Sequence, residues 1–125
     1  MNPEVRETLE RVREISLKLP RAVEKVSHGA PVFYIDKGKT FAWFLNDHHN
    51  SGITAVAVKT SGREEQEMLV ETRPDLYYLP PYFAPSGWVG LRLDSDEVDW
   101  DHVADRIAIS WELVAPKRLL EMGGR

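Results

Sequence analysis

The spacing of apolar residues predicts a helix at the start of the chain. One face repeats with the 3.6-residue period of an α-helix and is formed by Val5, Leu9, Val12, Ser16 and Leu19. Asn2 is suited to cap this helix, and Pro3 is suited to its first position. Because Pro20 cannot continue a helix, the predicted helix spans residues 3–19.

The apolar pattern then changes to that of strands. Short apolar or alternating runs occupy residues 32–35, 40–45 and 53–59. The sequence Asp-Lys-Gly-Lys at 36–39 predicts a hairpin turn, in which Gly38 is the residue able to adopt a positive φ. The run at 40–45 is apolar on both faces, which favours a central place in the sheet. Together these segments predict an antiparallel meander of three strands.

A second helix is predicted after the meander. Ser61 and Glu64 have the spacing of a capping box, in which each side chain accepts a hydrogen bond from a free backbone N–H. The apolar stripe of this helix is thin and consists of Met68, Leu69 and Val70. Arg73-Pro74 ends the helix, because a residue before proline avoids helical geometry.

The last third of the chain predicts a strand and two helices. In strand 88–93, alternation places Val89, Leu91 and Leu93 on one face and Trp88, Gly90 and Arg92 on the other. Asp99 is suited to cap a third helix, whose apolar stripe is Trp100, Val103, Ala104, Ile107, Trp111 and Val114. A short helix from Lys117 to Met122 follows, and Gly123-Gly124 ends the fold.

The strands are grouped together rather than alternating with helices, which is typical of the α+β class. We expect one domain over residues 1–125 with two layers, an antiparallel sheet of about five strands and helices on one face. The expected order along the chain is helix, three strands, helix, one or two strands, helix and short helix.

Residues 77–87 form a proline-rich aromatic stretch that precedes strand 88–93. Its aromatic residues are Tyr77, Tyr78, Tyr82 and Phe83, and its prolines are Pro80, Pro81 and Pro85. Proline cannot donate a hydrogen bond to a neighbouring strand, so we expect a loop or an edge strand here. Such a loop is either a lid over the core, which is the interpretation that we favour, or a preformed contact surface.

Composition limits the classes of function. The net charge is −4, and residues 63–112 hold four arginines against twelve acidic residues. Because proteins bind nucleic acid mainly by neutralising phosphates, DNA binding here requires a local basic patch. The chain has no cysteine, which excludes disulfides and thiolate metal sites and agrees with a cytoplasmic location. No apolar run is long enough to predict a signal peptide or a membrane span.

The polar residues do not point to catalysis, a metal or a cofactor. No serine lies in a Gly-x-Ser-x-Gly motif, and the adjacent Ser27 and His28 would point to opposite sides of a strand. His48-His49 is interpreted as a polar turn, because no second histidine lies at i,i+4 spacing. The acidic run at 94–101 lacks the pattern of an EF-hand, and there is no glycine-rich phosphate motif. We therefore expect a protein that is not an enzyme.

Several motifs taken together resemble the MmcQ/YjbR family of small bacterial proteins. In chain order they are Leu19-Pro20 with Glu24, His28-Gly29-Ala30-Pro31-Val32-Phe33, Lys39-Thr40-Phe41-Ala42, Pro81-Tyr82-Phe83-Ala84-Pro85-Ser86-Gly87-Trp88-Val89, Asp99-Trp100 and Leu113-Val114-Ala115-Pro116-Lys117-Arg118-Leu119. The resemblance covers residues 5–120. It implies a two-layer α+β domain similar to secretion chaperones and CyaY-like proteins. It also implies a "double-wing" DNA-binding domain, and the family supplies no catalytic residues.

The leading functional hypothesis is therefore a binding domain whose ligand is DNA. Its candidate phosphate contacts are Lys37, Lys39, Lys59, Arg63 and Arg92. Its candidates for stacking on bases are Tyr34, Tyr82 and Trp88. Lys37 and Lys39 lie on the predicted hairpin tip, where they would act as a wing on the phosphates.

Two other functions remain open. One is an adaptor for a protein partner, resembling secretion chaperones, in which Tyr82 and Phe83 are exposed apolar anchors. Buried rings in this loop would count against that function. The other is a pocket for a small ligand, walled by Trp43, Tyr78 and Trp88.

Overall fold

The computed structural model describes residues 1–121, apart from the side chain of His49. Its helices are α1 (Pro3–Leu17), α2 (Arg63–Thr72), α3 (Trp100–Val114) and α4 (Lys117–Glu121). Its strands are β1 (Ala22–Ser27), β2 (Ala30–Ile35), β3 (Thr40–Asn46), β4 (Thr54–Lys59), β5 (Tyr77–Tyr78) and β6 (Trp88–Arg92). Two short 3-10 helices, η1 (His48–Asn50) and η2 (Ala84–Ser86), lie in loops. The predicted ending at Met122 and Gly123-Gly124 falls outside the described residues.

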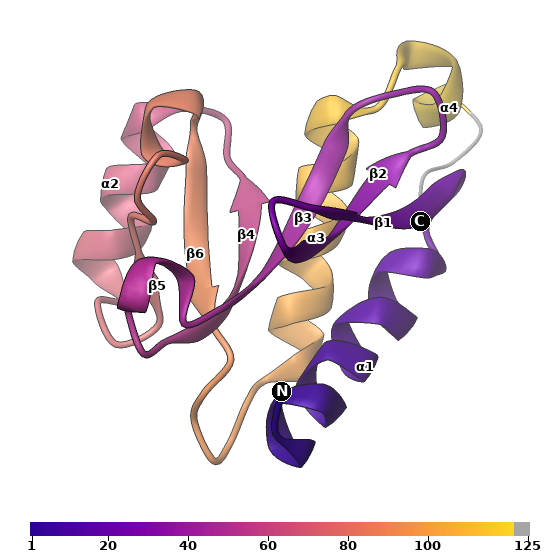
Figure 1. The fold of residues 1–125 in the computed structure, drawn as a ribbon. Helices are drawn as coiled ribbons and strands as arrows, with labels where there is room; N and C mark the ends of the chain where they lie inside the picture. Colours follow the sequence, from indigo (N-terminus) through magenta and orange to yellow (C-terminus); the bar gives the residue numbers. More distant parts are fainter. Residues whose placement is uncertain (122–125) are drawn as a thin grey trace.

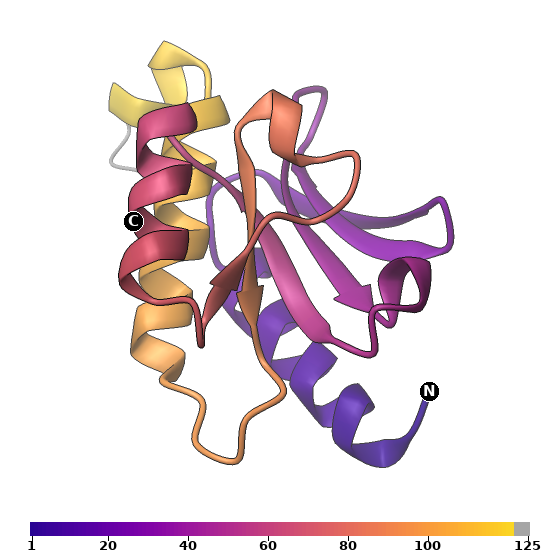
Figure 2. The same ribbon diagram turned by 90° about the vertical axis from the view of Figure 1, so that its left-hand side faces the viewer.

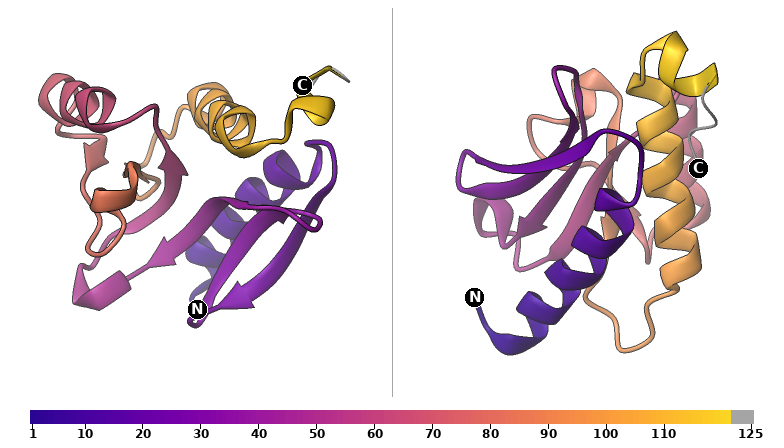
Figure 3. Two further views of the ribbon diagram at one scale, coloured as in Figure 1. Left: turned by 90° about the horizontal axis from the view of Figure 1, so that it is seen from above. Right: turned by 90° about the vertical axis from the view of Figure 1, so that its right-hand side faces the viewer.

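The strands form one antiparallel sheet in the order β1-β2-β3-β4-β6-β5 (Figure 1). In Figure 2, α2 and α3 lie on one side of the strands, and the loops that contain η1 and η2 lie on the other. The view from above in Figure 3 shows α2, α3 and α4 along the same side of the bent sheet. The α+β class is therefore confirmed, and the sheet has six strands where about five were expected.

β1 is the strand that the sequence pattern did not reveal. It pairs with β2 through a tight turn in which His28 and Gly29 have φ values of 51° and 78°. Positive φ at both central residues is the geometry of a type I′ hairpin, and histidine tolerates it better than most residues. The strand was not predicted because Glu24 interrupts the apolar pattern. In the fold Glu24 faces the helices, and its Oε1 lies 2.6 Å from the Nε of Arg13.

The β2–β3 hairpin forms where it was predicted, but a different residue makes the turn. Lys37 has the positive φ of 62°, whereas Gly38 does not. A Cβ on Gly38 would lie 3.2 Å from the carbonyl oxygen of Ile35, and the amide of Gly38 donates to that same carbonyl at 2.6 Å. The glycine is therefore needed for close approach of the backbone.

α2 begins without the predicted capping box. Gly62 is the N-cap, and the acidic residue that reaches back is Glu65, whose carboxylate accepts from the amide of Ser61 at 2.8 Å. The predicted apolar stripe is also wrong in part, since Met68 is 50% exposed. The buried residue of this helix is Gln66.

The core lies between the sheet and α1 and α3. Trp111, Ile107 and Val12 from the helices pack with a set of fully buried strand residues that includes Phe33, Phe44, Val56 and Leu91. The predicted caps are confirmed, since Asn2 accepts from the amide of Val5 and Asp99 accepts from that of His102. Ser110 ties α3 to the sheet, because its hydroxyl accepts from the amide of Lys59 at 2.8 Å and donates to the carbonyl of Phe41.

Candidate functional site

The face of the sheet opposite the helices carries a row of large and small side chains. Strand pairing places Trp43 beside Ala57, Ala57 beside Gly90, and Gly90 beside Tyr78. The ring of Tyr78 lies directly over Gly90, because a Cβ added to Gly90 would come within 2.4 Å of that ring. Two aromatic rings therefore flank a floor of small residues, and we call this surface the loop face.

Phe83 closes the loop face from above. Its ring contacts Trp43 edge to face at a centroid distance of 5.1 Å, and lies 5.7 Å from His48 and 6.1 Å from Trp88. Edge-to-face contacts of this kind add to the stability gained from burial alone. Trp43, Phe83 and Trp88 are each half-buried. The predicted loop thus packs onto the sheet with Phe83 inside it.

Polar contacts fasten the same loop, residues 79–87, to β4 and α2. The Nζ of Lys59 donates to the carbonyl of Ser86 at 2.7 Å. The buried amide of Gln66 donates to the carbonyl of Ala84 at 2.9 Å. The backbone carbonyls of this loop have no strand partner, so they need donors from side chains. Gln66 is buried because its amide supplies one of these donors.

Tyr82 and Tyr34 differ from the rest of the aromatic set. Tyr82 is 81% exposed and has a φ of 70°, a conformation that is uncommon for a bulky residue. Tyr34 lies on β2, where the Nζ of Lys25 sits 4.6 Å from its ring centroid. The structure therefore brings Trp43, Phe83 and Trp88 into one cluster, leaves Tyr82 at the surface, and places Tyr34 two strands away from β4.

The candidate cations divide into three groups. Lys37 and Lys39 are exposed on the β2–β3 hairpin, and neither forms an ion pair within residues 1–121. Lys59 and Arg63 are at the same end of the sheet but line a cavity beside α2. Arg92 lies at the opposite end of the sheet, as its pairing with Ala55 shows.

Arg92 is also the cation least able to meet a phosphate. Its guanidinium donates two hydrogen bonds of 3.1 Å to the carboxylate of Asp94. Burial acts to raise the pKa of Asp94, but these hydrogen bonds outweigh it and hold the pKa below its ordinary value. The structure does not bring Arg92 together with the other four cations.

The two ends of the sheet differ in the charges that their connections carry. The β2–β3 hairpin and α4 lie at the upper end of the molecule in Figures 1 and 2, and the β6–α3 connection lies at the lower end. The β2–β3 hairpin at the upper end carries Lys37 and Lys39, and α4 carries Lys117 and Arg118. Residues 94–101 at the lower end carry five acidic side chains and no basic one. We call the upper end the basic end.

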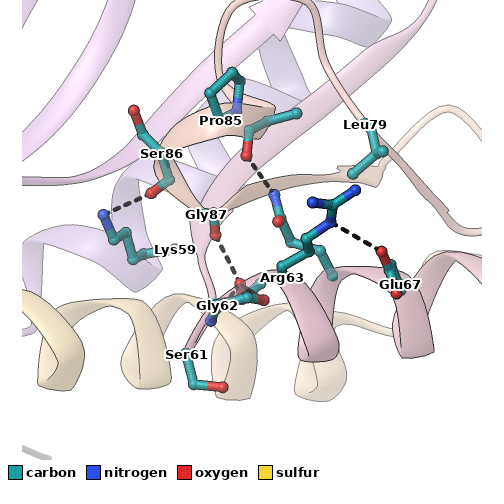
Figure 4. Close-up of a pocket in the computed structure, with 12 residues that line it drawn as sticks. Lys59, Ser61, Gly62, Arg63, Glu67, Leu79, Pro85, Ser86 and Gly87 are labelled. Atoms are coloured by element: carbon teal, nitrogen blue, oxygen red, sulfur yellow. Dashed lines mark hydrogen bonds and ion pairs between the residues drawn. The ribbon is translucent and has the colours of Figure 1, made fainter.

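The cavity beside α2 has a volume of about 630 Å³ (Figure 4). The cavity is lined by the end of β4, the start of α2 and part of loop 79–87. Lys59, Ser86 and Arg63 are among its polar residues, and Leu79 and Pro85 are among its apolar ones. Trp43, Tyr78 and Trp88 do not line this cavity, nor those beside α1, beside the β1–β2 turn and beside His102.

A buried polar group between α2 and α3 was missed from the sequence. Arg106 is 7% exposed, and its Nη1 lies 3.6 Å from the carboxylate of Glu65. Burial acts to raise the pKa of Glu65, but the Ser61 amide and Arg106 together hold it below the ordinary value. Nearby, the hydroxyl of Tyr77 bonds to Nε2 of His102, and burial raises the pKa of Tyr77. Glu65 and Arg106 are 41 residues apart in the chain, so no local pattern marks them.

Two further findings concern residues 1–121. No three His, Cys, Asp or Glu side chains are grouped so that they could hold a metal ion. In addition, none of the helices in this range has the length and apolar character that a membrane span requires.

Comparison with known proteins places this chain in a family. The YjbR family model matches residues 17–113. The fold is similar to that of a Deinococcus radiodurans protein, DR2400, a DUF419 domain, with a TM-score of 0.70, 19% identity and 94% of each chain covered. No curated protein matches the sequence. YjbR is a domain of unknown function and not a known family of enzymes. Since the family model matches most of its length, the chain belongs to the YjbR family.

Proposed function

We propose that this protein binds DNA without catalysis, through contacts between the β2–β3 hairpin and the phosphate backbone. The observation that carries the proposal is the state of the two hairpin lysines. Lys37 and Lys39 are exposed and form no ion pair within residues 1–121. The acidic residue of the same turn, Asp36, is paired with Arg21 at 3.4 Å. The hairpin therefore presents positive charge that no neighbour neutralises.

The lysines and arginine on the hairpin and α4 bear on the objection raised by the net charge of −4. Phosphate contacts are short-range in physiological salt, where screening acts over about 8 Å. A duplex docked at the basic end would meet Lys37, Lys39 and the α4 residues Lys117 and Arg118, while the acidic run at 94–101 lies at the other end. We place this function in the bacterial cytoplasm, where a chain without cysteine needs no oxidising compartment.

The adaptor function has weaker support. It requires the aromatic rings of loop 79–87 to be open to a partner, but Phe83 packs inside the ring cluster. The exposed large apolar side chains of the loop are Tyr82 and Leu79, at 81% and 48%. A Tyr82→Ser variant removes the anchor of an adaptor but leaves the hairpin lysines in place, so salt-dependent binding to the duplex should persist.

The test is fluorescence anisotropy with a labelled duplex and a labelled single strand, between about 50 and 200 mM salt. We expect affinity for DNA to fall steeply with salt. The Lys37→Glu/Lys39→Glu variant should bind more weakly, and the slope of log K against log salt should be shallower by about two. Arg6→Glu/Lys25→Glu changes the net charge equally away from the basic end and serves as the control.

Two results would overturn the proposal. One is no binding at the lowest salt. The other is equal weakening in the hairpin variant and in the control, which would show that net charge alone, and not the hairpin, governs the interaction.

A further inference from the structure

We infer that the cavity between β4, the first turn of α2 and loop 79–87 binds a phosphomonoester that has an apolar body. Lys59 from β4 and Arg63 from α2 line the cavity, and Leu79, Ala84 and Pro85 line its apolar side. This juxtaposition of two cations with an apolar wall carries the inference. It concerns a site separate from the hairpin and goes beyond the proposed function.

Lys59 is held in position but retains donors for a ligand. Its Nζ donates to the carbonyl of Ser86 at 2.7 Å and lies 5.8 Å from the ring centroid of Trp88. An ammonium group has three N–H donors, so two remain for an anion. The Ser86 carbonyl and the Trp88 ring hold the ammonium group in one position, which lowers the entropy cost of binding a ligand.

Arg63 is the more exposed member of the pair. Its side chain is 89% exposed and forms one ion pair of 3.1 Å, with Glu67. An exposed pair of this kind contributes little to stability, so Arg63 can turn toward a ligand at small cost. Glu67 also lines the cavity, which leaves two positive charges against one negative charge. Figure 4 shows Arg63 and Glu67 extending from α2, with Lys59 and Ser86 on the other side of the cavity.

The lining selects the class of ligand. A phosphomonoester carries a charge of about −1.5 to −2 at pH 7, which suits two cations better than the single charge of a carboxylate. Ser61 and Ser86 also line the cavity. The volume of about 630 Å³ is within the usual range for small-ligand sites, and the wall formed by Leu79 and Pro85 suits a flat or aliphatic body.

The experiment is an NMR titration of the ¹⁵N-labelled protein with three probes: deoxyadenosine 5′-monophosphate, inorganic phosphate and deoxyadenosine. We expect the monophosphate to shift the amide signals of Gly62 and Gly87, both of which line the cavity. Inorganic phosphate should shift the same signals with lower affinity, because it has no apolar body. Deoxyadenosine, which lacks the phosphate, should leave them unchanged.

Variants assign the binding to the two cations. Lys59→Gln/Arg63→Gln should weaken monophosphate binding by about tenfold or more, since hydrogen bonds to charged groups are among the strongest. Arg63→Gln alone removes an exposed side chain, leaves the Lys59–Ser86 bond intact and should give a smaller loss. It keeps the test valid if the double variant folds poorly. Lys37→Gln/Lys39→Gln is the matched control, with unchanged monophosphate binding expected.

Three results would overturn the inference. They are no shift of the cavity amides with the monophosphate, equal affinity in the Arg63→Gln variant, and equal weakening in the hairpin control. Failure of DNA binding at the hairpin would leave these outcomes untouched, so the two ideas are tested separately.

Discussion

The two faces of the sheet are closed in different ways. On the helix-covered face, Phe33, Phe44 and Trp111 are at most 1% exposed and belong to one continuous core. On the loop face, the proline-rich loop 79–87 covers the strands. Its Phe83 ring packs on Trp43 but stays half-buried. The first arrangement supplies the stability of the fold. The second combines half-buried rings with hydrogen bonds from Lys59 and Gln66.

The difference originates in the residues on each face of the same strands. The side chains of β4 that face the helices are Val56 and Val58, and those that face the loop are Ala55 and Ala57. Large side chains interlock with a helix, whereas small ones leave room that rings from elsewhere must fill. Tyr78 fills that room over Gly90 at one end of the row, and Trp43 stands at the other.

The largest effect is expected from emptying the helix-covered face. Trp111→Ala should reduce the free energy of unfolding by about 4 kcal/mol, because the fully buried ring is lost together with the hydrogen bond from its Nε1 to the carbonyl of Pro20. Urea denaturation followed by circular dichroism measures this loss. Trp88→Ala on the loop face is the comparison and should cost less than half as much. Equal costs would mean that the two faces contribute alike.

A second change tests the polar contact between α2 and α3. Glu65→Gln should cost about 2 kcal/mol at pH 7, because Arg106 would stay buried without its charged partner. Since the pKa of Glu65 is lowered by folding, its stabilisation is complete above the ordinary value of 4.5 and is lost as the pH falls through the folded value. The difference between wild type and variant should therefore shrink below that pH. Glu64→Gln is the control and should change stability by less than about 0.5 kcal/mol.

Removing the Phe83 ring from the loop face should have a smaller effect on the free energy of unfolding. Phe83→Ala should cost about 1.5 kcal/mol, because the ring is only partly removed from water in the native protein. The near-ultraviolet circular dichroism of Trp43 and Trp88 should change at the same time, since both rings contact Phe83. Tyr82→Ala should leave that spectrum nearly unchanged. A loss as large as that of Trp111→Ala would show that the loop belongs to the core.

The smallest effect tests the row beneath the loop. Gly90→Ala should cost about 1 kcal/mol, because the new Cβ would lie 2.4 Å from the ring of Tyr78 and push it aside. In a Tyr78→Ala background the same substitution should cost almost nothing. A double-mutant cycle measures this coupling directly, and additivity of the two changes would rule out the contact.

Much of the fold could be predicted because its determinants are local. The caps Asn2 and Asp99 act within three residues, and the alternation in strand 88–93 correctly assigned Val89 and Leu91 to the core. β1 escaped prediction because its charged residue Glu24 finds its partner, Arg13, on α1 and not within the local sequence. The start of α2 was misassigned because Glu65, rather than Glu64, is placed by Arg106 on α3.

The candidate sites depended far more on tertiary structure. The sequence suggested one set of cations: Lys37, Lys39, Lys59, Arg63 and Arg92. In the fold the first two lie on a hairpin, Lys59 and Arg63 line a cavity, and Arg92 forms an ion pair with Asp94. It named the aromatic residues of the loop, and folding turned Phe83 inward and Tyr82 outward. The sequence by itself determined the helices, most of the strands and the family. Only the tertiary structure decided which charges stay unpaired and which rings meet, because these depend on contacts between residues far apart in the chain.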